Sequence, residues 1–374
     1  MFQALLINTL FFFGLSHGSL MASAILTLTH AKWGRPVKRL AESTAFFIPV
    51  SWILFLILFA GMDHLFLWAD PQQTLPQKTW WLNRPFFVIR NVVLVFITGL
   101  IGIIYVAKSI KPDLAYLQKK EPGLLSRGAK KLTRFLKIQE SKNSDSQVAL
   151  AALYVALFIV LCCLVAFDWM MSLDQEWIST AFGFQYTVAN LYAACAFLVL
   201  GFALARRHKA LLPYFSLERL NDLSRLLLVT SLLWTYLVFS QVLVIWYANL
   251  PEETPYLLLR MKDAHWDWLF DLLFVCLFAV PLLGLLTKKA CRSPLVSSGV
   301  AIICLIGLWL EKYFLTVPTI QQHLQYPGTE PLPYFSIFDI AISLGMLAVF
   351  LLSIYYFLRV FPILPCSDPL LSKE

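Results

Sequence analysis

Long apolar stretches alternate along the chain with short polar connections. Nine stretches are about 20 residues or longer, the length that a helix needs to cross the hydrocarbon core of a bilayer. They predict spans at 3–28, 43–69, 85–107, 147–172, 180–205, 224–249, 266–287, 294–318 and 334–360. No soluble domain fits between them. We therefore expect an all-α, polytopic integral membrane protein whose residues 1–374 form a single membrane domain.

Composition supports the membrane class. The chain is 59% hydrophobic and 14% charged, with a mean hydropathy of +0.71, whereas a soluble domain averages about 45–50% apolar and about 25% charged residues. The net charge of +8 is spread over alternate loops. It therefore indicates membrane orientation and not nucleic-acid binding.

The basic residues predict the orientation. Loops on one side carry 24 lysines and arginines, and those on the other side carry 4. The positive-inside rule then places the C-terminus in the cytoplasm and the N-terminus in the periplasm. The basic loop 108–146 becomes cytoplasmic. Its segment 124–138 is either an amphipathic helix on the inner leaflet or simply a signal for topology.

A few ionisable side chains fall inside the predicted spans, where they usually serve a substrate or proton path. We predict a proton pathway of four residues, namely His64, Asp168, Glu311 and Asp339. His64 and Asp168 are expected to act together near the outer face. The structural alternative is a buried ion pair between Asp168 and Arg90. Gln241 is a lone amide within an apolar span, which must face protein or water.

The cysteines and histidines do not form the ligand patterns of a redox centre. None of the seven cysteines forms a CxxC or CxxCH pattern, and most lie within apolar spans as small hydrophobic residues. His17 and His30 share the first span but do not lie on one helical face. The sequence therefore predicts no catalytic residue, no metal site, and no haem or iron–sulfur cluster in this chain.

Four motifs identify a resemblance. In chain order they are WLNRPFFVIRN, FDWMMSLD, IWYANLPEE and FPILPCSDPLL. Together they resemble one of the two related NrfD/polysulfide-reductase-like membrane proteins of alternative complex III, from about the second span to the C-terminus. Members usually begin with a further span and a His-rich stretch. The resemblance implies two four-helix bundles plus one extra helix. By motif, family positions are matched by His64, Asp168, Asn249, Glu252 and Glu253.

The resemblance also implies a function. The chain would be a subunit of a bacterial quinol:cytochrome c oxidoreductase in the inner membrane, contributing to proton translocation. Haem and iron–sulfur centres would belong to partners: an NrfD-like quinol-binding subunit, multihaem and monohaem cytochromes c, an iron–sulfur subunit, and a terminal oxidase. Quinol, either menaquinol or ubiquinol, is generally placed in the companion subunit, so its binding here stays open. Residues for quinone binding or structure are Arg90, Gln241, Tyr247, Asn249, Glu252 and Glu253.

Two other functions remain open from the residues alone. A proton-coupled secondary transporter would use intramembrane carboxylates to couple protons to a solute. A structural anchor would need them only for pairing.

Overall fold

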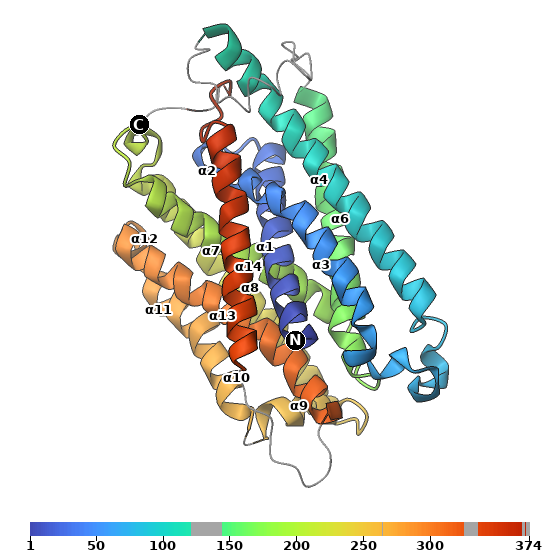
Figure 1. The fold of residues 1–374 in the computed structure, drawn as a ribbon. Coiled ribbons are helices and arrows are strands. Elements are labelled where there is room, and N and C mark those ends of the chain that lie inside the picture. Colours follow the sequence, from blue (N-terminus) through green and yellow to red (C-terminus); the bar gives the residue numbers. More distant parts are fainter. Residues whose placement is uncertain (121–143, 264, 325–335, 369–370, 372–374) are drawn as a thin grey trace.

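A computed structural model describes the chain except for residues 121–143, 264, 325–335, 369–370 and 372–374. Within the described part, nine helices are long and apolar enough to cross a membrane, and no strand occurs (Figure 1). The predicted all-α, polytopic membrane fold is therefore confirmed.

The bounds of the spanning helices are as follows. They are α1 (Phe2–Leu28), the continuous segment α2 (Arg35–Ser43), η1 (Thr44–Phe47) and α3 (Ile48–Ala60), α4 (Arg84–Lys120), α6 (Ser144–Trp169), α7 (Phe182–Ala205), α8 (Leu217–Ala248), the segment α10 (Asp267–Phe274), η8 (Val275–Ala279) and α11 (Val280–Leu285), α13 (Pro294–Leu324), and α14 (Ile337–Val360).

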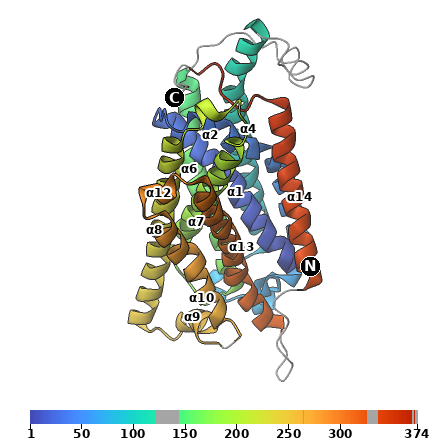
Figure 2. The same ribbon diagram turned by 90° about the vertical axis from the view of Figure 1, so that its left-hand side faces the viewer.

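The helices form two groups of four and one outer helix. The first group contains α1, α2–α3, α4 and α6, and the second contains α7, α8, α10–α11 and α13. The two groups meet mainly where α1 and α6 pack against α7. Helix α14 packs on α1, η1 and α2, at the edge of the molecule in Figure 2.

Helix α1 lies at the centre and is buried along nearly its whole length. Its small residues let α7 approach closely. A Cβ atom at Gly14 would lie 2.1 Å from the side chain of Asn190, and one at Gly18 would lie 2.4 Å from the Asn190 carbonyl oxygen. Such small residues favour packing between membrane helices, where apolar surface alone gives little preference for protein over lipid.

The two ends of the molecule differ in charge. Basic residues gather at one end, in α2, in the last turns of α4, in the turn after α7 and in α12 (Lys288–Cys291), and we call this end the basic end. The opposite end contains the short 3₁₀ turns between α3 and α4 and the short helix α9 (Thr254–Met261). The placement of the basic end in the cytoplasm remains a prediction.

The ends of several helices differ from the predicted spans. The second spanning segment begins at Arg35 and ends at Ala60, where 43–69 was expected, and α4 continues to Lys120, beyond the expected 107. The additional helical turns contain the buried charges of Arg39, Glu42 and Asp113, where hydropathy alone predicts a loop, whereas the mostly apolar residues 61–69 form short 3₁₀ turns. The predicted amphipathic helix at 124–138 lies outside the described residues.

Candidate functional site

Asp168, near the end of α6, is held by four hydrogen bonds. One carboxylate oxygen accepts from Arg90 Nε at 2.7 Å and Asn91 Nδ2 at 2.6 Å, and the other accepts from Arg90 Nη2 at 2.7 Å and Trp81 Nε1 at 3.2 Å. The Arg90 guanidinium also stacks on the Trp81 ring at 4.1 Å. This geometry is that of the buried ion pair, the structural alternative raised by the sequence.

His64 lies apart from this cluster. It is exposed, in a 3₁₀ turn after α3, and its ring stacks on Phe2 with centroids 5.4 Å apart. It lines an open polar cavity of about 720 Å³ together with Asp63 and Asp70. The described residues show no hydrogen bond between His64 and Asp168, so the structure does not bring the predicted pair into contact. Their role in proton transfer stays a prediction.

Asp339 and Asn249 lie at helix ends, where each has a local structural role. The Asp339 carboxylate accepts from the Ser336 backbone at 2.9 Å and forms a capping box at the start of α14. Asn249 adopts the left-handed conformation (φ 47°) that ends α8. The remaining sequence candidates in this turn are Tyr247, which is 86% exposed, the exposed Glu252 and the half-buried Glu253.

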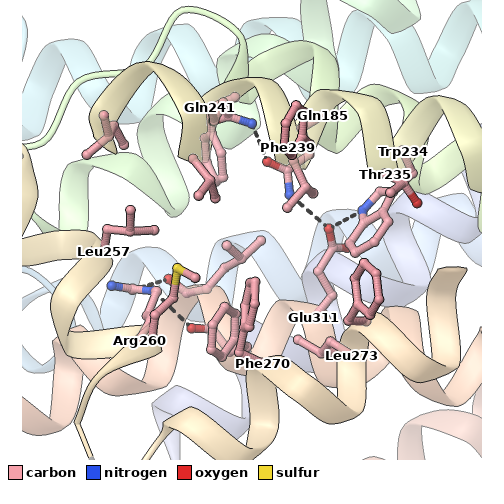
Figure 3. Close-up of a pocket in the computed structure, with 18 of the residues that line it drawn as sticks. Gln185, Trp234, Thr235, Phe239, Gln241, Leu257, Arg260, Phe270, Leu273 and Glu311 are labelled. Carbon is pink, nitrogen blue, oxygen red and sulfur yellow. Dashed lines mark hydrogen bonds between the residues drawn. The ribbon is translucent and has the colours of Figure 1, made fainter. Parts of the chain in front are cut away.

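The second helix group encloses an apolar pocket that collects other sequence candidates (Figure 3). It lies between α7, α8, α9, α10 and α13 and has a volume of about 320 Å³. Phe239 and Phe274 line it and are also 60% and 45% exposed. The pocket therefore opens sideways, towards the lipid, between α8 and α10. We call it the α8 pocket.

One wall of the α8 pocket carries a line of polar groups. Ser179 Oγ donates to Gln241 Oε1 at 2.8 Å, and Gln241 Nε2 donates to Gln185 Oε1 at 2.6 Å. Gln185 Nε2 then donates to Glu311 Oε1 at 3.1 Å, and Trp234 Nε1 reaches the same oxygen at 2.6 Å (Figure 3). The Gln241 amide, predicted to face protein or water, and the intramembrane carboxylate of Glu311 thus belong to one network.

Glu311 is balanced by its neighbour in the chain. Lys312 Nζ donates to Glu311 Oε2 at 2.6 Å and lies 4.7 Å from the centroid of the Tyr186 ring. Both charged side chains are only 2% exposed. Removal of either partner would leave an uncompensated buried charge, which is strongly destabilising.

Arg260 borders the pocket on its other side. Pro318 in α13 has no N–H, so the Phe314 carbonyl four residues earlier loses its helical donor. Arg260 Nε donates to that carbonyl at 3.2 Å, and Nη2 donates to the Leu315 carbonyl at 2.9 Å. The guanidinium also stacks on the Tyr256 ring at 3.6 Å. Burial lowers the pKa of Arg260 and raises the pKa of Tyr256 to about 12.

A second buried network, near the basic end, was missed from the sequence. Arg39 pairs with Glu42 and Asp113, and the Arg39 Nε–Asp113 Oδ2 distance is 3.0 Å. Glu42 also accepts from Ser109 Oγ at 2.6 Å and Ser23 Oγ at 3.1 Å. The local signal was the spacing of Arg39 and Glu42, three residues apart as helical ion pairs require.

Among the described residues, no group of three or more His, Cys, Asp or Glu is arranged to hold a metal ion. His17 is buried, and its Nδ1 lies 2.9 Å from the Tyr154 hydroxyl. Within the described part of the chain, the seven cysteines form no disulfide.

Comparison of the chain with protein-family models found no match, and comparison with curated proteins found no match either. The relation to alternative complex III therefore rests on the four sequence motifs and enters below as a proposal.

Proposed function

We propose that this chain is a membrane subunit of a quinol-oxidising electron-transfer complex of the alternative complex III type, in a bacterial inner membrane. The proposal is supported by one observation above all: an apolar, lipid-facing pocket whose wall ends at the buried carboxylate of Glu311. Electrons would pass to haem or iron–sulfur centres in partner subunits, as the motifs suggest.

The α8 pocket suits a quinol because of how its polar groups are distributed. Small-molecule pockets of about 300–1,000 Å³ are mostly apolar, with a few polar groups that fix orientation. Here Phe239, Phe274 and their neighbours offer contacts for a ring and an isoprenoid tail, and the opening faces the bilayer in which quinols dissolve. Gln241 and Gln185 would hold a quinol hydroxyl near Glu311.

Oxidation of a quinol to a quinone releases two electrons and two protons. Among the described residues that line the pocket, Glu311 is the carboxylate, so it would accept the two protons one after the other and pass the first on before it takes the second, while the electrons go to centres in partner subunits. Lys312 Nζ, which donates to the other oxygen of Glu311, would hold the carboxylate in place. In this proposal proton transfer depends on Glu311, while the onward path through His64, Asp168 and Asp339 remains a prediction from sequence.

Quinone binding tests the proposal directly. Trp177 and Trp234 line the pocket, so quenching of tryptophan fluorescence by a short-chain ubiquinone or menaquinone should report occupancy. Gln241→Leu should weaken binding about tenfold, the value of one hydrogen bond. Gln118→Leu, an exposed change of the same kind on α4, is the control. Equal affinities in the two variants would refute a quinone site here.

Turnover is tested in the assembled complex. Glu311→Gln leaves Lys312 unpaired, so the double variant Glu311→Gln/Lys312→Gln is measured beside it. If both assemble, quinol oxidation should fall at least about tenfold in each. Normal turnover by an assembled double variant would contradict a role for Glu311 in proton transfer.

One observation favours the proton-coupled transporter as a second candidate. The segment η8 is π-helical, and its Phe278 lines the α8 pocket. Such irregular turns are frequent at functional sites and in transporter helices. Solute-dependent proton uptake by liposomes containing the chain alone, without quinone binding, would support this candidate instead.

A further inference from the structure

A second apolar cavity lies between α14 and the rest of the molecule, separate from the α8 pocket. It has a volume of about 580 Å³ and is walled by α1, α7, α13 and α14. Several wall residues are also exposed, among them Leu204 (50%), Ile306 (54%) and Leu351 (53%). The cavity is therefore a groove that is open to the bilayer along its side. We call it the α14 groove.

The end of the groove far from the basic end is closed by polar groups that satisfy one another. Asn8 Nδ2 donates to Ser343 Oγ at 2.8 Å, and Trp309 Nε1 donates to Asn8 Oδ1 at 3.0 Å. Along the remaining length the walls are almost entirely aliphatic and aromatic. The interior therefore offers a surface for hydrocarbon, and it has little to offer a polar ligand.

The length of the groove is that of a lipid chain. Ser343 and Leu358, both in its wall, lie fifteen residues apart on α14, which is about 22 Å at about 1.5 Å per residue. One leaflet of the hydrocarbon core is about 15 Å thick, half of about 30 Å. A single acyl chain would therefore fit within the groove from its mouth at the basic end.

Basic residues flank that mouth where α7 ends. His208 lines the groove just beyond the end of α7, between the exposed Arg207 and Lys209. On α14 the exposed Arg359 follows Leu358 in the chain, but its guanidinium donates to the Tyr355 hydroxyl, outside the groove wall. No carboxylate in the described residues forms an ion pair with Arg207 or Lys209. Basic residues at this level of a membrane attract anionic headgroups.

We infer that the α14 groove binds an anionic diacyl phospholipid, with one acyl chain between α14 and α7/α13 and the phosphate at Arg207, His208 and Lys209. The bound lipid would fill the gap between α14 and the second helix group and so join them. The inference is independent of the quinol proposal, because the two cavities share no wall residue.

The inference can be tested by native mass spectrometry of the purified full-length chain. The chain is first delipidated, and either phosphatidylglycerol or phosphatidylcholine with the same acyl chains is then added. Phosphatidylglycerol should bind more tightly, at about one per chain. The double variant Arg207→Gln/Lys209→Gln removes two cations, which together contribute about 2 kcal/mol to the binding of an anionic headgroup. Because about 1.4 kcal/mol corresponds to a factor of ten, phosphatidylglycerol should bind about 30-fold more weakly. The same variant should leave phosphatidylcholine unchanged.

Two matched controls make the test specific. Lys288→Gln/Lys289→Gln removes two exposed charges at the same end but outside the groove, and should have no effect. Leu347→Trp fills the groove and should abolish retention of the lipid, whereas Leu352→Trp, on the lipid-facing side of α14, should not. Equal binding of the two lipids, equal effects of the two charge variants, or a lipid-free dimer with α14 at its interface would each overturn the inference.

Discussion

Replacement of Asp168 by asparagine should destabilise the protein strongly, because every group around the carboxylate is a hydrogen-bond donor. Arg90 contributes two N–H groups, and Asn91 and Trp81 contribute one each. An asparagine amide would place its own NH₂ group against at least one of these donors. It would also leave the Arg90 charge, 8% exposed, without a counter-ion. Breaking a buried pair in this way costs about 3–5 kcal/mol.

The matched control is Asp63→Asn. Asp63 pairs with Arg84 at the same end of the molecule, but the two side chains are 59% and 49% exposed. Loss of an exposed pair should cost less than about 1 kcal/mol. Unfolding can be followed by titration with SDS in mixed micelles, using the reactivity of the buried thiols of Cys162 and Cys195, which should become accessible on unfolding.

A double-mutant cycle completes the test. Arg90→Gln combined with Asp168→Asn removes both charges and should recover about 2–3 kcal/mol of the summed single losses. If Asp168→Asn costs no more than Asp63→Asn, the ion pair does not stabilise the fold. If the variant is stable and assembles but its complex releases fewer protons, Asp168 belongs to the proton pathway instead.

Three further predictions concern packing and helix ends. Gly18→Ala should destabilise the fold by more than about 1 kcal/mol in SDS titrations, because the added Cβ would clash with the backbone of α7. The control Gly299→Ala, with open space around the added Cβ, should be neutral or stabilising. Asp339→Ala should cost about 1 kcal/mol through loss of the α14 cap and leave proton release by the complex unchanged; reduced release would contradict the capping role. Arg260→Lys should lower the free energy of unfolding by about 1–3 kcal/mol, because one ammonium group cannot replace the guanidinium that donates to the Phe314 carbonyl. A decrease no larger than that of an exposed Arg→Lys change would refute this.

The sequence was informative where structure depends on local composition. Helices that face lipid must be apolar for about 20 residues, so hydropathy found all nine among the described residues. It failed where charges are buried against distant partners. Arg39 and Asp113 are 74 positions apart in the sequence. A hydropathy window of about 20 residues cannot detect that the two charges offset each other's desolvation cost.

The candidate site was predictable in its parts only. Gln241 and Glu311 were singled out because a polar group in an apolar span needs a partner. Their connection through Gln185 depends on the packing of α7, α8 and α13, which residue spacing does not encode. The direct partner of Asp168 is Arg90, on a helix between His64 and Asp168 in sequence, and the joint action of His64 and Asp168 on protons stays a prediction.

The burial of α1 has a consequence for how the protein is made. This helix has the lowest mean hydropathy of the nine described spans, and its main neighbour α7 begins 180 residues after it in the chain. That separation is a delay of about 10–40 s at about 5–20 residues per second of synthesis. The partners of the buried Asn8, Trp309 on α13 and Ser343 on α14, are made later still. The insertion machinery must therefore keep this polar face of α1 away from lipid until those helices have been inserted. The high hydropathy of the whole chain does not reveal this dependence of membrane insertion on the machinery.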